Sequence, residues 1–261
     1  SYIKTDGKNF VSVINENSYK YSQNYRNKLI KIIKFLNTNK SLRRKKYIKF
    51  HETIVTNKFI QIIKQFIKEY SIEYSSIDYI GISGQTVFHD PKNKKTIQLG
   101  SCKKIQKKLK LKIVGNYREN DIKNGGQGAP IGAFYHKYIL KNYSSTSSAI
   151  INLGGIANIS YINKEKLIAF DLGPANVLID DLMLFFYKKN YDKDGKKAFI
   201  GKINKKLINI YKNDNFFKLK YPKSLDREYF KNYYNQLKKI RMEDAICTAS
   251  MMTIEGILLG M

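Results

Sequence analysis

Two glycine-containing segments, close together in the chain, carry most of the information about the fold: IINLGGIANI at 150–159 and FDLGPAN at 170–176. In the first, apolar residues flank Gly154-Gly155, a dipeptide that favours a primed hairpin turn. The second predicts a strand ending at Asp171 and then a helix starting at the Gly-Pro step. Glycine hairpins and helix N-termini present backbone N–H groups that bind phosphate. With an aspartate between them, they predict a phosphoryl-transfer site.

The composition is that of a globular protein with an unusually high positive charge. The chain has 261 residues, of which 43% are hydrophobic, and a net charge of +27. The excess charge is mostly Lys spread along the whole chain, and no RRM, KH, helix-turn-helix or zinc signature accompanies it. We therefore expect no nucleic-acid partner, although the positive field would attract anionic substrates.

The sequence also bears on the compartment. No stretch approaches the ~18–20 apolar residues of a membrane span, and no N-terminal signal pattern is present. The two cysteines, Cys102 and Cys247, lie far apart without a CxxC or metal-binding spacing. We expect two reduced thiols in a cytoplasmic protein with no membrane partner.

Strands and helices alternate along the chain, which predicts an α/β layer architecture. The polar Ser/Thr run at 142–148 is the best candidate for a domain boundary, so we predict α/β domains over residues 1–146 and 147–261. The second domain is expected to open with three strands and a helix, at 149–153, 156–162, 166–171 and 174–187.

Two further motifs, GQTVFH at 84–89 and GGQGAP at 125–130, complete a family resemblance. Together with the first two segments they resemble the anhydro-N-acetylmuramic acid kinases, from about Tyr2 to the C-terminus and with six or more blocks in the family's order. The resemblance implies an actin–hexokinase-type, ribonuclease H-like fold. Two α/β domains would close over a cleft for sugar and nucleotide, and each would open with a β-hairpin that faces the phosphates.

The resemblance also implies a reaction. Water would open the internal ether of 1,6-anhydro-N-acetylmuramic acid, and the freed oxygen at carbon 6 would take the terminal phosphoryl group of ATP. The product, N-acetylmuramate 6-phosphate, would serve cell-wall recycling. The expected ligands are the sugar, ATP and Mg²⁺, with the metal carried by ATP rather than by protein ligands. We consider a homodimer as the assembly of the protein. The alternatives are another sugar kinase of the same fold, an inactive remnant, or a basic protein that binds nucleic acid.

The resemblance assigns roles on the nucleotide side of the site. Asp171 would be the general base for the attacking water, while the residues themselves also allow a helix-capping aspartate. The expected phosphate-binding residues are Gly154, Gly155, Asn158, Gly173 and Asn176. A plain tight turn is the alternative for the two hairpin glycines. Ala175 replaces the second glycine of the family's Gly-Pro-Gly-Asn.

On the sugar side, the planar guanidinium of Arg118 suits the lactyl carboxylate of a muramic acid. The alternative is an Arg118–Asp121 ion pair that holds the glycine loop. His89 is expected to be a surface or packing residue, and Arg227 either reaches the cleft or pairs with Glu228 or Asp226. The full set of expected substrate-binding residues is Gln85, Thr86, Arg118, Asp121, Gln127, Gly128 and His136.

Two segments of the family pattern are not found in this sequence. Family members open with a Gly-Thr-Ser-x-Asp-Gly hairpin before the segment that Tyr2 to Gly7 resembles, and they carry a later Gly-Gly-Gly segment. We therefore expect the first domain to lack its first hairpin and the second to be incomplete. These 261 residues alone would bind ATP poorly.

Overall fold

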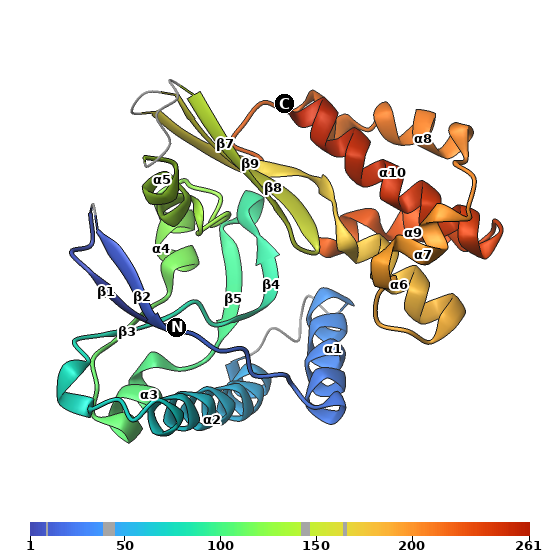
Figure 1. Cartoon of the computed structure of the whole chain (residues 1–261). Coiled ribbons are helices and arrows are strands. Elements are labelled where there is room, and N and C mark those ends of the chain that lie inside the picture. Colours follow the sequence, from blue (N-terminus) through green and yellow to red (C-terminus); the bar gives the residue numbers. More distant parts are fainter. Residues whose placement is uncertain (9, 39–44, 142–146, 164–165) are drawn as a thin grey trace. The chain divides into compact units, whose positions relative to one another are not determined.

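The computed structural model describes residues 1–8, 10–38, 45–141, 147–163 and 166–261. The described chain is mixed α/β, as the alternation of strands and helices predicts. It divides into two compact units, Ser1–Gly128 and Ala129–Met261 (Figure 1). The predicted boundary falls partly on residues 142–146, which lie outside the described residues. The division comes earlier because helix α5 (Ala133–Lys141) packs against the sheet of the second unit.

The described residues of the first unit form three two-stranded sheets. β1 (Tyr2–Thr5) and β2 (Val11–Asn15) form an antiparallel hairpin. β3 (Ile80–Ile82) pairs in parallel with β6 (Ile113–Gly115), and β4 (Gln85–Asp90) pairs antiparallel with β5 (Lys95–Leu99). Two short 3₁₀ helices, η2 (Tyr74–Ser76) and η3 (Pro91–Asn93), lie in the connections.

Helices cover the β3–β6 and β4–β5 pairs and build two apolar clusters. α1 (Gln23–Thr38) and α2 (Lys45–Glu69) meet β4 and β5 at Ile32, Leu36, Val55, Val87 and Leu99. α2 and α3 (Cys102–Leu109) meet β3 and β6 around Ile67, Ile82, Ile105, Leu109 and Leu111. α4 (Tyr117–Lys123) lies beside β5, and the glycine loop follows it. The β4–β5 hairpin is therefore held between α1 and α2 on one side and α4 on the other.

The second unit is built on an antiparallel sheet of β7 (Ser147–Leu153), β8 (Ile156–Asn163) and β9 (Lys166–Pro174), with β8 in the centre. This confirms the three predicted strands. α5 and α10 (Met242–Gly260) cover opposite faces of this sheet. His136 of α5 bonds Ser160, whereas Ile257 of α10 packs in the cluster that contains Ile159. Ser160 and Ile159 are neighbours on β8, so their side chains face opposite sides of the sheet.

The remaining helices of the second unit surround α10 and form its main core. They are α6 (Asn176–Tyr187), α7 (Lys196–Phe199), α8 (Lys205–Lys212) and α9 (Lys231–Leu237), with the short 3₁₀ helices η4 (Lys193–Gly195), η5 (Asn215–Lys218) and η6 (Arg227–Phe230). The fully buried side chains of this core include Leu178, Leu182, Met183, Tyr211, Leu237 and Ile246.

Two local predictions at the glycine segments were wrong. Leu153 pairs with Ala157, which leaves a three-residue loop, and neither Gly154 nor Gly155 has the positive φ that a primed turn needs. The helix after β9 begins at Asn176 rather than at Pro174, because the strand continues past Asp171 and Pro174 still pairs with Ile156.

Candidate active site

A row of polar side chains crosses one face of the three-stranded sheet. Asn152 on β7 lies opposite Asn158 on β8, and Asn158 lies opposite Asp171 on β9. Residues directly opposite each other in antiparallel strands point to the same face, so the three side chains share one face, beside the glycine hairpin. A bulge at this end of the β8–β9 pair adds Leu172 to β9 between Asp171 and Gly173.

Asp171 is the buried member of this row. Its side chain is 5% exposed, and Oδ2 accepts a hydrogen bond of 2.7 Å from the Leu225 backbone N–H. Its own N–H donates to the Lys223 carbonyl at 3.0 Å. The capping interpretation is wrong, because Ala175 occupies the N-cap position of α6 and Asp171 lies in the strand. The carboxylate is thus held by a segment distant in sequence.

The start of α6 is fastened to the glycine hairpin. The Gly155 carbonyl accepts hydrogen bonds from the backbone N–H groups of Ala175 and Val177, each at 3.0 Å. The Gly154 carbonyl accepts one from the Asn176 N–H, also at 3.0 Å. The side-chain Nδ2 of Asn176 donates to the carbonyls of Leu153 and Gly154, both at 3.0 Å. Because both of its amide hydrogens are engaged, Asn176 shapes the hairpin, and donation to a phosphate would require breaking these bonds.

The glycines of the two segments have different surroundings. A Cβ at Gly154 would have its nearest neighbour at 3.6 Å, and one at Gly155 at 3.9 Å. Neither the packing nor the backbone conformation therefore requires glycine there. A Cβ at Gly173 would instead lie 2.6 Å from the Tyr211 hydroxyl, so β9 needs glycine to pack against α8.

In the first unit, Arg118 and Asp121 hold the glycine loop through the backbone of Gly128. Nη1 of Arg118 donates to the Gly128 carbonyl at 3.1 Å, and Asp121 Oδ2 accepts from the Gly128 N–H at 2.7 Å. Gly128 has φ +67, which favours glycine, and a Cβ at Gly126 would lie 2.1 Å from Asp121 Oδ2. These bonds agree with the interpretation in which Arg118 and Asp121 hold the glycine loop. Both bonds are made to the backbone of Gly128.

His89, which was expected to be a surface or packing residue, is half-buried beside this site. Its Nδ1 lies 3.1 Å from the Thr96 hydroxyl. Burial and then the charge of Arg118 lower the pKa of His89, while the backbone of Gln127 acts in the opposite direction. His89 thus lies beside Arg118 and the glycine loop, where burial and the neighbouring charge disfavour its protonated form. The sequence contained a signal that His89 lies near the site, because this residue ends the GQTVFH motif. A lone histidine is more often structural, however.

The other predicted substrate residues fall in both units. Gln85 and Thr86 begin β4, where Gln85 Nε2 donates to the Thr86 carbonyl at 3.3 Å. His136 belongs to the second unit, where its Nδ1 lies 2.8 Å from the hydroxyl of the fully buried Ser160. Arg227 binds Asp181 on α6, so the predicted pairing with Glu228 or Asp226 was wrong.

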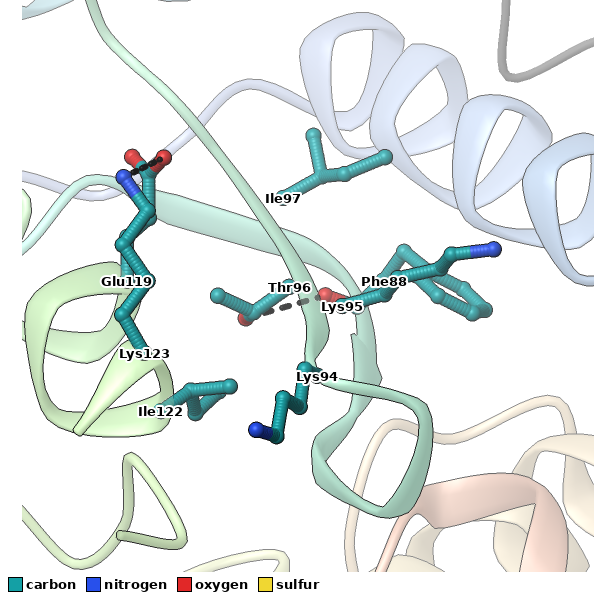
Figure 2. A pocket seen from close by; sticks show the side chains of 8 residues that line it. All are labelled: Phe88, Lys94, Lys95, Thr96, Ile97, Glu119, Ile122 and Lys123. Atoms are coloured by element: carbon teal, nitrogen blue, oxygen red, sulfur yellow. Dashed lines mark hydrogen bonds and ion pairs between the residues drawn. The ribbon is translucent and has the colours of Figure 1, made fainter. Parts of the chain in front are cut away.

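A cavity of about 460 Å³ lies between α4 and the β4–β5 hairpin (Figure 2). Phe88, Ile97 and Ile122 provide its apolar walls, and an ion pair of 3.0 Å between Lys123 and Glu119 lies on α4. Its lining also includes Thr96, whose hydroxyl donates to the Phe88 carbonyl at 3.4 Å, and Lys94 and Lys95. None of the predicted site residues lines it.

Within the described parts of the chain, no group of three or more His, Cys, Asp or Glu side chains is placed to hold a metal ion. Among the same residues, none of the helices combines the length and the apolar character that crossing a bilayer requires.

The fold and the site define a mixed α/β protein that carries a glycine hairpin beside a buried aspartate. The model of the family described as anhydro-N-acetylmuramic acid kinase matches residues 2–258, and the chain belongs to this family. This confirms the resemblance drawn from the motifs.

Curated relatives with the same name support the assignment. The chain is 36% identical over 208 residues to the anhydro-N-acetylmuramic acid kinase of Zymomonas mobilis, covering 79% of this chain and 56% of the relative. It is 31% identical over 253 residues to that of Pelagibacter ubique (95% and 66%), and 30% identical over 212 residues to that of Hydrogenovibrio crunogenus (79% and 57%). The chain thus spans less than two thirds of the length of these relatives.

Proposed function

We propose that the whole protein is an ATP-dependent anhydro-N-acetylmuramic acid kinase that converts 1,6-anhydro-N-acetylmuramic acid to N-acetylmuramate 6-phosphate for cell-wall recycling. The observation that carries the proposal is the buried Asp171 carboxylate, aligned with Asn158 beside a glycine hairpin, in a chain that belongs to this family. We further infer the actin–hexokinase type of fold.

In the proposed reaction, Asp171 accepts a proton from the water that attacks the anomeric carbon. The new bond joins the water oxygen to that carbon, and the bond from the anomeric carbon to the oxygen at carbon 6 breaks. That oxygen then takes the terminal phosphoryl group of ATP, and ADP leaves. The hydrogen bond from the Leu225 N–H supports this role, because it fixes the carboxylate and favours its ionised form.

The nucleotide phosphates would lie against Gly154, Gly155 and Asn158. A Cβ at either glycine would make only ordinary contacts with the protein, so packing does not explain the choice of glycine, and a ligand that approaches the backbone closely would. Gly173 and Asn176 would contribute by shaping this hairpin. Mg²⁺ would arrive with ATP and neutralise charge on the transferred phosphoryl group.

The sugar would be held from the first unit by Gln85, Thr86 and the glycine loop, with Arg118 facing the lactyl carboxylate. Asp121, Gln127 and Gly128 would set the shape of that loop. His136 would be a further substrate-binding residue. We also infer that the protein is cytoplasmic, because the free thiols Cys102 and Cys247 suit a reducing compartment. We infer no nucleic-acid or membrane partner.

The test is turnover by the whole protein, purified and supplied with ATP, Mg²⁺ and one sugar at a time. We expect ADP and a 6-phosphorylated sugar to form from 1,6-anhydro-N-acetylmuramic acid, with little reaction of glucose or N-acetylglucosamine. A preference for ordinary hexoses would instead identify another sugar kinase of the same fold. No turnover with any sugar would identify an inactive remnant.

A further inference from the structure

A buried lysine lies beside the segment that holds Asp171. Lys223 is 7% exposed and has no part in the proposed reaction. It begins the stretch KSLDREYF at 223–230. Its Nζ lies 4.4 Å from the ring centre of Phe216 and 5.7 Å from that of Phe170, and donates to the Phe216 carbonyl at 3.4 Å. Aromatic faces attract cations, most strongly away from water, so the rings compensate for the buried charge.

The backbone around Lys223 is fastened to β9 at several points. The Lys223 carbonyl accepts from the Asp171 N–H at 3.0 Å, and two residues later the Leu225 N–H donates to Asp171 Oδ2 at 2.7 Å. Tyr221 stacks on Phe170, with ring centres 5.6 Å apart and an interplanar angle of 14°. The segment 221–225 therefore follows β9 and reaches the carboxylate through a backbone N–H.

We propose that Lys223 is a positioning residue for Asp171: its ammonium group, which lies over the rings of Phe216 and Phe170, fastens the segment 221–225 so that the Leu225 N–H donates to the carboxylate. Phe170 and Asp171 are neighbours on β9 and face opposite sides of the sheet. Lys223 therefore acts through the backbone of the segment. This inference takes its functional meaning from the proposed role of Asp171 as a base.

The donated hydrogen bond makes the ionisation of Asp171 measurable. It favours the charged carboxylate, so its loss should raise the pKa of Asp171. Burial lowers the pKa of Lys223, consistent with an ammonium group that needs the rings and the carbonyl. Other ionisable groups on the adjoining elements include His136, bonded to Ser160, Glu255, paired with Lys212, and Asp226, which accepts from the Glu228 N–H.

The experiment follows the Leu225 amide proton by NMR while the pH of the 261-residue chain is changed. This proton reports the ionisation of the carboxylate to which it donates. Lys223→Met keeps the length and apolar character of the side chain but removes the charge. We expect it to raise the midpoint of the titration by about one pH unit, the size that corresponds to losing a hydrogen bond to a charged group. Lys223→Arg, which keeps a cation, should shift it less.

The matched control is Lys238→Met. Nζ of Lys238 lies 4.7 Å from the ring centre of Tyr234, a similar contact that does not involve the segment 221–225. Lys238→Met should leave the midpoint of the titration unchanged. Asp171→Asn should abolish the titration, which would assign it to the Asp171 carboxylate. Phe216→Leu, which removes one ring face, should raise the midpoint in the same direction and serves as the second variant if Lys223→Met does not fold.

Equal midpoints in the Lys223→Met and Lys238→Met proteins would overturn the proposal. Because this measurement needs no turnover, its outcome is separate from that of the proposed function. Normal turnover by the whole protein carrying Asp171→Asn would remove the base role, while a raised midpoint in Phe216→Leu, which keeps the lysine charge, would still establish that the held lysine positions the carboxylate.

Discussion

At the scale of single residues, the surroundings of Asp171 combine burial with a donated hydrogen bond. Burial alone raises the pKa of a carboxyl group, whereas a backbone N–H that donates to the charged form lowers it. Asp171 has both, since it is 5% exposed and accepts from Leu225 at 2.7 Å. A base in this position is fixed in orientation before the substrate binds, which favours proton transfer in one geometry.

Asp171→Asn tests the base role in the whole protein. The amide cannot take a proton from water, so we expect kcat to fall roughly 10²–10⁴-fold. Its oxygen can still accept from the Leu225 N–H, so the thermal midpoint should change little. The control is Asp226→Asn, at a carboxylate that also accepts from a backbone N–H, at 2.8 Å from Glu228, and it should leave kcat unchanged. Near-normal turnover of the Asp171 variant would exclude the base role.

Arg118→Ala distinguishes a substrate contact from a loop contact. If the guanidinium binds the lactyl carboxylate, the variant should bind anhydro-muramic acid more weakly by about 1.5–3 kcal/mol and should bind an analogue without the lactyl group almost normally. If Arg118 only holds the Gly128 carbonyl, the affinities for both sugars should fall equally. Arg227→Ala is the control, because that guanidinium already binds Asp181 and should not discriminate between the sugars.

At the scale of elements, the hairpin, β9 and the start of α6 form one connected unit. The hairpin carbonyls receive the first N–H groups of the helix, and β9 packs its glycine against α8. The hydroxyl of Tyr211 lies at this contact, is buried, and has no hydrogen-bond partner among the described residues. Glycine at 173 is therefore a packing requirement, whereas glycine at 154 is not.

Two glycine substitutions should separate these roles. Gly154→Ala should unfold in urea like the parent chain and raise the KM for ATP in the whole protein. Gly173→Ala should lower the free energy of unfolding by about 1–3 kcal/mol, because the new methyl group would lie 2.6 Å from the Tyr211 hydroxyl.

Tyr211→Phe is the matching control, since it removes the hydroxyl that the Gly173→Ala methyl group would contact. It should restore most of the stability lost in the Gly173→Ala chain. On its own it should be neutral or stabilising, because it removes a buried hydroxyl group without a partner. An equal loss of stability for Gly154→Ala and Gly173→Ala would contradict the distinction.

At the scale of the whole molecule, charge and ionisation shape stability. The chain carries a net charge of +27, and several of its 20 tyrosines are partly or fully buried. In the second unit, Tyr229 and Tyr233 both donate to Asp214. Burial, and then this hydrogen bond, raises the pKa of Tyr229 to about 12 and raises the pKa of Tyr233 as well.

These shifts predict alkaline destabilisation. The folded-state pKa of these tyrosines lies above the unfolded value of about 10, so the folded chain holds their protons more tightly than the unfolded chain does. The resulting stabilisation of the fold is complete below pH ~10 and is lost as pH rises through ~12. The thermal midpoint, followed by circular dichroism, should fall over this range. Asp214→Asn should make the fall less steep, because its carboxylate raises both pKa values. An equally steep fall in the variant would contradict this account.

The sequence by itself determined the family, the three strands of the second sheet and the position of Asp171 beside a glycine hairpin. These features are local: strand periodicity, turn residues and short motifs are set by neighbours along the chain. The start of α3 is local in the same way, because it follows Ser101, a residue type that favours the N-cap position, and Ser101 accepts from the Lys104 N–H. Motif order was enough to assign Asp171 a role, but not to show what surrounds it.

Only the tertiary structure decided how the site residues are used. Leu225 donates to Asp171 from 54 residues away, and Arg227 binds Asp181 from 46 residues away, so no local pattern could identify either pair. Asn176 donates to the hairpin instead of pointing outward, and Gly173 accommodates Tyr211. The physical reason is that these contacts depend on which strands and helices pack together, and packing joins residues whose separation in sequence carries no signal of their contact.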